Sequence, residues 1–107
     1  MLHILIMGAK WKAFFVEEEK YIRTWGDDTE AHTLPSKKEL YFNNAEITRK
    51  TIIHELCHAH YEEMCVGSAS LTKNQQEEVF CELFSEHGDK ILRLARRLYK
   101  EFKEETN

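Results

Sequence analysis

The alternation of hydrophobic and polar positions divides the chain into a strand-like first half and a helical second half. The segments 2–7, 29–34 and 38–43 are each followed by glycine, proline or asparagine, which is typical of short strands. Proline follows the second of these segments, so we expect that strand at an edge of a sheet. The segment 11–16 is either a further strand or the start of a short helix that continues to residue 20.

A first long helix is predicted from a cap at Asn43 or Asn44 to about Met64. Apolar residues recur in it every three to four positions, and this spacing places His54 near the inward face of the helix. The Gly-Ser-Ala-Ser stretch 67–70 then predicts a loop.

A second long helix is predicted from about Asn74, with a kink or a restart at Gly88-Asp89. Its apolar side is expected to belong to the core and comprises Phe80, Leu83, Phe84, Ile91, Leu94 and Leu98. Strands followed by helices indicate an α+β fold, here a small, twisted, mainly antiparallel sheet packed on the two helices.

Length and composition narrow the class of protein. With 107 residues the chain has room for one hydrophobic core, so we expect a single domain, 1–107. A hydrophobic content of 42% excludes a disordered chain, and a net charge of −4 argues against nucleic acid or an anionic membrane as partner. The segment 2–7 lacks the features of a signal peptide, and no stretch reaches membrane-spanning length. Three cysteines without CxxC spacing argue against a disulfide framework, so we expect a cytoplasmic protein.

The segment His54-Glu55-Leu56-Cys57-His58 is the strongest chemical signal in the chain. Because residues four apart lie above one another on a helix, His54 and His58 can direct imidazole nitrogens at one ion, with zinc as the expected metal. Glu55 is rotated by about 100° from His54, too far to ligate comfortably but well placed to reach a water on the ion. The pattern predicts a metallopeptidase in which Glu55 is the general base.

A catalytic zinc needs a third protein ligand besides the two histidines. We expect Glu77 in this role because it shares a helical face with Phe80, whereas Glu78 lies on another face and is the alternative. The metzincin pattern requires glycine and histidine where this chain has Tyr61 and Met64, so that class is excluded. A carboxylate from the following helix matches the arrangement of two histidines and one glutamate instead.

These motifs together suggest a known family. The segment 54–58, followed by Glu-Glu-Val-Phe-Cys-Glu-Leu at 77–83 and His-Gly-Asp at 87–89, resembles the minimal gluzincins. It is also similar to the small phage-encoded metallopeptidases related to the ImmA/IrrE group. The likeness covers roughly residues 31–98 and includes the strand at 39–42 that precedes the motif.

The resemblance implies a zincin-like fold, in which a small twisted sheet packs on an active-site helix and a glutamate helix. It implies that His54, His58 and Glu77 ligate zinc and that Glu55 is catalytic. Larger relatives carry extra regions that shape the substrate cleft or a partner domain, and this chain has no residues left over for them.

Two functions are open at this point. The first is a zinc-dependent peptidase whose peptide or protein substrate adds to the edge strand 29–34 through backbone hydrogen bonds. The second is a zinc-stabilised regulatory or protein-binding module without peptidase activity. Glu55 favours the enzyme, since a structural metal site needs no base beside its ligands.

Four residues are candidate hydrogen-bond donors to the oxyanion of the reaction, although each is more often a packing residue: His32, Tyr41, His60 and Tyr61.

Overall fold

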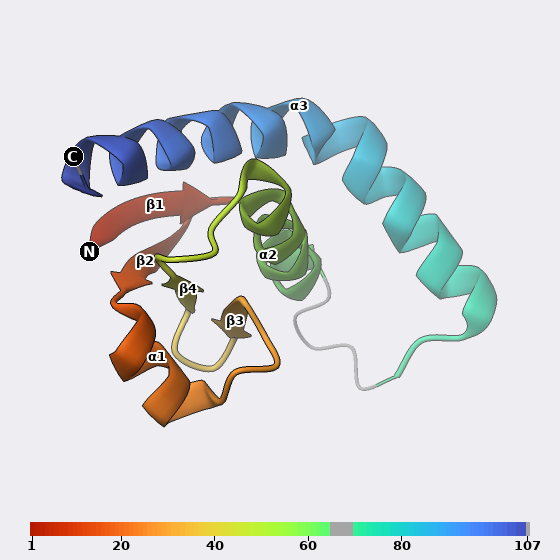
Figure 1. The fold of residues 1–107 in the computed structure, drawn as a ribbon. Coiled ribbons are helices and arrows are strands. Elements are labelled where there is room, and N and C mark those ends of the chain that lie inside the picture. The colour runs from red at the N-terminus through yellow and green to blue at the C-terminus, as the bar shows by residue number, and fades with distance from the viewer. Residues whose placement is uncertain (65–69, 107) are drawn as a thin grey trace.

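The computed structural model of the chain describes residues 1–64 and 70–106. Its elements, in chain order, are β1 (Leu2–Ile6), β2 (Ala9–Val16), α1 (Glu18–Trp25), β3 (Ala31–Leu34), β4 (Glu39–Asn43), α2 (Arg49–Met64) and α3 (Lys73–Thr106) (Figure 1). The expected α+β class is confirmed. The segment left open between strand and helix forms both, because β2 continues to Val16 and α1 follows it directly. Most of the loop expected at 67–70 lies outside the described residues.

The four strands form one sheet in the order β1-β2-β4-β3. The two outer pairs are antiparallel, as expected, but the central pair, β2 with β4, is parallel. A parallel pair needs a long connection between its strands, and here α1 and β3 provide it. The position of β3 at the end of the order confirms the predicted edge strand.

The first hairpin shows how the local sequence determines the register. Ile4 and Ile6 are buried, while the residues between and beside them are exposed, which is the alternation of a strand with one face in the core. Met7 and Gly8 both have positive φ, at 52° and 83°, as a two-residue type I′ turn requires. The turn pairs Ile6 with Ala9 and so continues the buried face from β1 into β2.

Helices cover both faces of the sheet near its β3 edge. Thr33 of β3 hydrogen-bonds to Glu55 of α2, whereas the next residue back, His32, stacks on Trp25 of α1. Successive side chains of a strand point to opposite faces, so α2 and α1 lie on opposite sides of β3. The core lies on the α2 side, and its fully buried large side chains there include Trp11, Leu40, Phe42, Ile52, Leu56 and Leu98.

Helix α2 begins later than the sequence suggested. The predicted cap at Asn43 or Asn44 is wrong because Asn43 still belongs to β4, where it pairs with Val16. The Asn43 side chain instead accepts a hydrogen bond from the backbone N–H of Ala45, at 3.0 Å, and forms a turn. Thr48 takes the cap position, since its hydroxyl oxygen accepts a hydrogen bond from the N–H of Thr51 at 3.1 Å.

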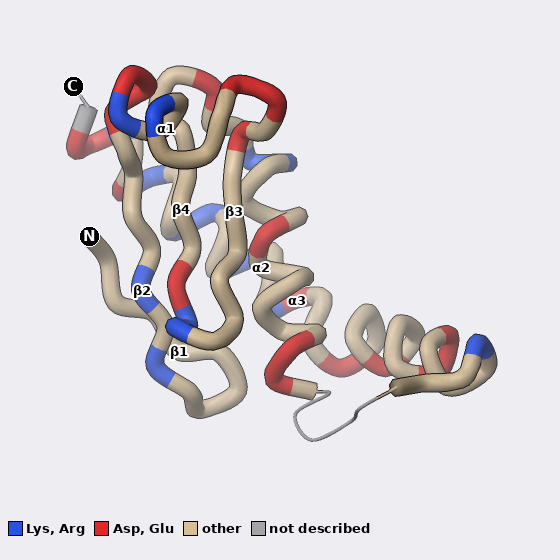
Figure 2. Tube along the Cα trace, turned by 90° about the horizontal axis from the view of Figure 1, so that it is seen from below, with Lys and Arg blue, Asp and Glu red and all other residues tan. Residues whose placement is uncertain are grey.

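Helix α3 starts with a reciprocal cap. The N–H of Gln75 donates to the hydroxyl of Thr72, and the N–H of Thr72 donates to the side-chain oxygen of Gln75. The helix is continuous through Gly88, and its axis bends along its length, so that the C-terminal half lies on the core and the N-terminal half extends away from the sheet (Figures 1 and 2).

The apolar side of α3 is therefore only partly core. Ile91 and Leu98 are buried, as expected, but Phe80 and Phe84 remain 61% and 75% exposed, so their expected place in the core is wrong. Helical spacing identified the apolar face correctly, but it does not say whether another element covers that face.

Charged residues are spread over the sheet and the helices. Acidic and basic segments occur close together at both ends of the molecule in Figure 2, without an extended region of basic residues. Among the helices of the described residues, none is both long and apolar enough to span a membrane.

Candidate metal centre

Helix α2 brings His54, Glu55 and His58 together. The Nε2 atoms of the two histidines lie 3.1 Å apart, and their rings meet edge to face with centroids 4.7 Å apart. One potential donor atom from each of the three residues lies within 4.8 Å of the others, and among the described residues no other group of this kind occurs. The predicted pairing of His54 with His58 is thus present in the geometry.

The distance between the two imidazole nitrogens fits a shared zinc ion. Two nitrogens bound to a tetrahedral zinc at about 2.0 to 2.1 Å each are separated by about 3.3 Å, close to the 3.1 Å observed. The side chain of His54 is 68% exposed, so the expectation that it faces inward is wrong. This exposure leaves room for water beside the two nitrogens, which a catalytic site requires and a closed structural site does not.

Glu55 is buried beside the histidines, with only 8% of its surface exposed. Its Oε1 atom accepts a 2.7 Å hydrogen bond from the hydroxyl of Thr33, and its Oε2 atom lies 3.9 Å from Nε2 of His54. A hydrogen bond of this length to a carboxylate is strong and directional, so it restricts the rotation of the Glu55 side chain. Thr33 thus holds one carboxylate oxygen and leaves the other turned towards the histidines.

Thr33 is a site residue that the sequence did not single out. Its place on the expected edge strand was known, but its contact with α2 depends on how the strand and the helix pack in three dimensions. The only local signal is a β-branched residue with a hydroxyl group in the middle of a short strand, and this pattern is common in strands without any site.

The candidate metal centre, formed by His54, Glu55 and His58, opens into a cleft between α2 and the edge strand β3. The cleft has a volume of about 390 Å³ and is lined by Ala31, His32, Thr33, Pro35, His54, Glu55, His58 and Glu62. Among the described strands β3 pairs only with β4, so its other edge presents backbone N–H and C=O groups without a strand partner along this cleft. An extended peptide has the complementary groups to pair with such an edge.

A second hollow lies on the opposite side of the histidines, between α2 and α3. It measures about 500 Å³ and is lined by Lys50, Ile53, His54, Cys57, His58, Tyr61, Phe80 and Leu83. The two imidazoles therefore face two spaces at once, the cleft towards β3 and the hollow towards α3.

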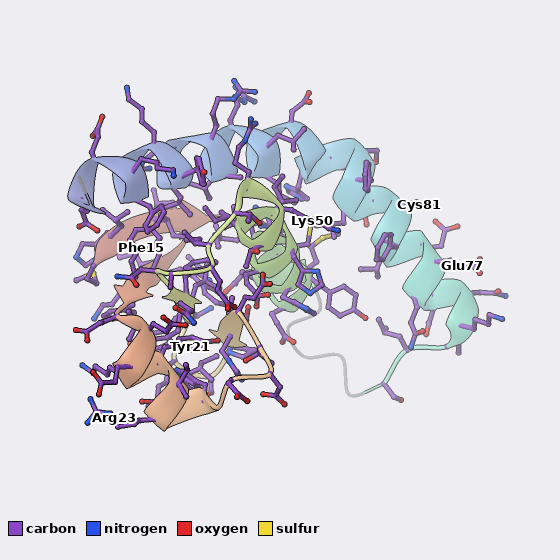
Figure 3. All side chains as sticks on the ribbon, in the orientation of Figure 1. Phe15, Tyr21, Arg23, Lys50, Glu77 and Cys81 are labelled. Carbon is purple, nitrogen blue, oxygen red and sulfur yellow. The ribbon has the colours of Figure 1, made fainter. Side chains whose placement is uncertain are left out.

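The expected third ligand is not beside the histidines in this structure. Glu77 lies near the N-terminal end of α3, well away from α2 (Figure 3). Both it and Glu78 are exposed, and neither belongs to the group formed by the two histidines and Glu55. The role of Glu77 as a zinc ligand stays a prediction.

Of the candidate oxyanion donors, three point away from the metal centre. His32 stacks on Trp25 and hydrogen-bonds to the Tyr21 hydroxyl at 2.9 Å, on the α1 side of the sheet, and Tyr41 lies on the same side. His60 is buried, and its Nδ1–H donates to the backbone carbonyl of Leu56 at 2.7 Å. Burial, together with the nearby positive charges of α3, lowers the pKa of His60.

Tyr61 and Cys57 are among the residues of α2 that line the hollow next to the histidines. Tyr61 lines it together with His54 and His58, so it stays a candidate oxyanion donor. Cys57 is half-buried, and its burial raises the pKa of the thiol.

The candidate metal centre thus combines two convergent imidazoles, one buried carboxylate and an open cleft along a strand edge. All of these features come from the geometry of α2 and β3. Comparisons of the chain with protein-family models, with curated proteins and with solved structures found no match.

Proposed function

We propose that this chain is a zinc-dependent metallopeptidase in which His54 and His58 ligate the metal and Glu55 is the general base. The observation that carries the proposal is the convergence of the two Nε2 atoms, 3.1 Å apart, beside a buried carboxylate. Two nitrogen donors with an adjacent carboxylate suit zinc, which prefers nitrogen, sulfur and carboxylate ligands in a tetrahedral arrangement. We propose likewise that the chain is related to the gluzincins and that its fold is zincin-like.

Each residue of the centre has a defined task in peptide hydrolysis. Zinc, when bound, supplies Lewis acidity that polarises a peptide carbonyl and lowers the pKa of a water towards about 7. Glu55 accepts a proton from the attacking water on its Oε2 atom and then transfers it to the nitrogen of the leaving amine. Thr33 holds the other oxygen of Glu55 during both transfers, so that the base does not have to reorient.

The substrate is expected to bind as an extended peptide along β3. The cleft between β3 and α2 runs past both histidines and Glu55, so a strand added to the edge of β3 passes directly in front of the base. Backbone hydrogen bonds to a strand edge depend little on the substrate's sequence, and side chains in the cleft then determine which peptides fit. The substrate class is therefore a peptide or an extended segment of a protein.

The test compares two glutamates that line the same cleft. Glu55→Gln should lower the turnover of fluorogenic peptides by about 10² to 10⁴, the usual contribution of a general base, while zinc stays bound. Glu62→Gln is the matched control, because Glu62 lies on the same helix and lines the same cleft but is exposed. It should keep turnover within about threefold, as expected of a surface substitution.

The outcome separates the two functions that the sequence left open. Full turnover by the Glu55→Gln variant would reject the assigned base. If the wild-type protein binds zinc, cleaves no peptide in a broad library and unfolds when zinc is chelated, the zinc-stabilised binding module is the correct function instead.

A further inference from the structure

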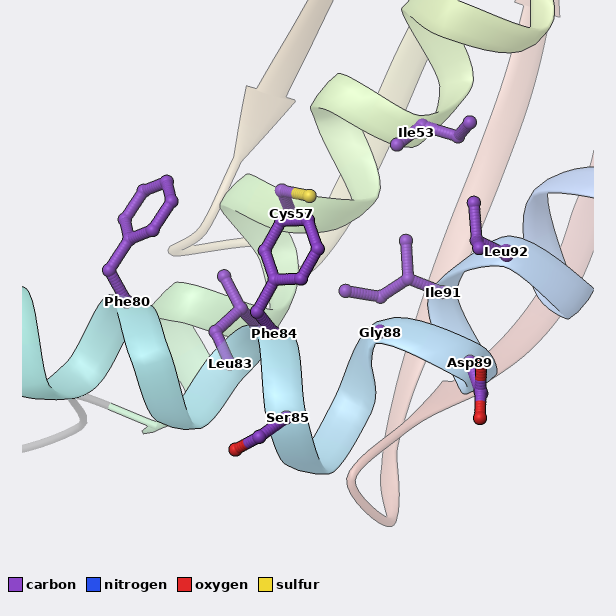
Figure 4. Close-up of a pocket in the computed structure, with 10 residues that line it drawn as sticks. All are labelled: Ile53, Cys57, Phe80, Leu83, Phe84, Ser85, Gly88, Asp89, Ile91 and Leu92. Carbon is purple, nitrogen blue, oxygen red and sulfur yellow. The ribbon is translucent and has the colours of Figure 1, made fainter.

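The N-terminal half of α3 presents an apolar face that the rest of the described structure leaves largely exposed. Phe80 and Phe84 lie one turn apart and are 61% and 75% exposed. They face Ile53 and Cys57 of α2 across a groove of about 230 Å³ (Figure 4). Burial of large aromatic side chains is favourable, so an open groove with a mostly apolar lining favours a movement that closes it.

The groove leads directly to the metal centre. Ile53, Cys57, Phe80 and Leu83 line both the groove and the hollow that contains His54 and His58. The cleft along β3 approaches the same two histidines from the other side. A ligand that comes from α3 therefore reaches the metal without entering the space expected for the substrate.

Gly88 separates a half of α3 that is buried at many positions from a half that contacts the rest of the fold at few. Beyond it, Ile91, Ala95, Leu98 and Phe102 are buried in the core, whereas among the described residues of α3 before Gly88 only Leu83 is buried. Glycine is among the weakest helix formers, so a long helix bends or breaks most easily there. The space around Gly88 is open, since an added Cβ would approach only the Phe84 ring, at 4.0 Å.

We propose that zinc binding closes the N-terminal half of α3, residues 73–87, onto α2 by a bend at Gly88, and that this movement delivers Glu77 to the metal. The inference rests on the proposed metal centre. Closure buries Phe80 and Phe84 against Ile53 and Cys57 and supplies the third protein ligand that a catalytic zinc needs.

Helical phase favours Glu77 over its neighbour as the delivered ligand. At 100° per residue, Glu77 is rotated by about 60° from Phe80, whereas Glu78 is rotated by about 160°. When Phe80 turns into the groove, Glu77 is thus carried to the side of α3 that meets α2, and Glu78 stays on the opposite side.

Metal binding determines whether the open or the closed form of α3 is favoured. Bending a continuous helix at Gly88 breaks helical hydrogen bonds, which costs free energy. Burial of two phenylalanines offsets part of this cost. A metal that binds the closed form more tightly than the open form shifts the balance towards closure by its difference in affinity, and closure tightens metal binding by the same factor. The open form is then the metal-free state.

The direct test measures the distance between the two helices with and without zinc. Spin labels are placed at Glu62→Cys on α2 and Glu82→Cys on α3, two exposed positions outside the groove, after Cys57, Cys65 and Cys81 are replaced by alanine or serine. One equivalent of zinc should give a shorter and narrower distance distribution by pulsed electron paramagnetic resonance. The same sample should stay monomeric in sedimentation, since a zinc-dependent dimer would overturn closure within one chain.

Variants then identify the ligand and the bend. Glu77→Ala should abolish the zinc-induced shortening and weaken zinc binding by at least about tenfold, whereas Glu78→Ala should change neither. Gly88→Ala fits the structure without a clash, stiffens the helix and should weaken zinc binding without changing the ligand set. Loss of closure with Glu78→Ala but not with Glu77→Ala would overturn the ligand assignment.

The same experiments distinguish the failure of this inference from the failure of the proposed function. Zinc that binds to His54 and His58 without any change of distance would refute closure and leave the metal centre intact. A wild-type chain that binds no zinc would refute the metal centre, and closure with it.

Discussion

Replacing Thr33 by valine isolates the one hydrogen bond that orients the proposed base. Valine has nearly the same shape as threonine and is also β-branched, so it fits the strand and leaves no cavity. The substitution removes only the hydroxyl that donates to Glu55 over 2.7 Å. Any change in stability or activity therefore reports on that contact.

The expected loss follows from the burial of Glu55. A hydrogen bond to a charged group contributes about 1.5 to 3 kcal/mol, and removing one partner leaves the other to find a replacement. Glu55 is 8% exposed and borders an open cleft, so water can partly replace the hydroxyl and the loss should lie near the lower value, about 1.5 kcal/mol. For a domain of this size that corresponds to a fall in Tm of about 6 to 12 °C.

The assay is thermal and urea denaturation of the metal-free protein, followed by circular dichroism. Thr33→Ser keeps the hydroxyl and should retain most of the stability. In a Glu55→Met background the acceptor is gone, so Thr33→Val should there cost less than about 0.5 kcal/mol. An equal loss in both backgrounds, or no loss in the wild-type background, would show that the contact between Thr33 and Glu55 does not stabilise the fold.

Two further predictions concern the pH dependence of stability. Burial alone would raise the pKa of Glu63, but hydrogen bonds from Lys38 and Trp11, with the charge of Lys38, outweigh it and lower the pKa below 4.5. Glu63→Gln should therefore cost about 1 kcal/mol at pH 7. The difference from wild type should shrink as the pH falls from 4.5 through the lowered pKa, because the stability linked to the ionised carboxyl is lost there; urea titrations at pH 7 and at acidic pH check this. Burial lowers the pKa of His60 below 6.5, so the stability of the wild type should fall as the pH drops from 6.5 through the lowered value. His60→Gln should flatten the plot of unfolding free energy against pH between about pH 7 and pH 5. An unchanged slope would contradict this prediction.

The parts of the site that lie on one helix were predictable from the sequence. The convergence of His54 and His58 depends only on the rise and rotation of α2, which are the same in every α-helix. Glu55, as the next residue along the same helix, is placed by the same geometry. Local chemistry also predicted the edge position of β3, because Pro35 follows it directly.

The parts that depend on packing between elements were not predictable. The contact from Thr33 to Glu55 requires β3 to lie against α2 in one register, and no local pattern encodes that register. The exposure of Phe80 and Phe84 depends on the direction of α3 relative to α2, and helical spacing carries no information about it. The predicted start of α2 was wrong because Asn43 and Thr48 are both good cap residues. Asn43 pairs with β2 as part of β4, so Thr48 caps the helix.

The most direct test of the metal centre is the zinc stoichiometry of the purified chain. Calorimetric titration at pH 7.5, with metal analysis of the dialysed protein, should show one zinc per chain for the wild type. His54→Ala and His58→Ala should each weaken binding by at least about 100-fold, since each removes a ligand, whereas His32→Ala on the opposite side of β3 should not. Binding that is absent from the wild type, or equally strong in both histidine variants, would contradict a zinc centre at this position.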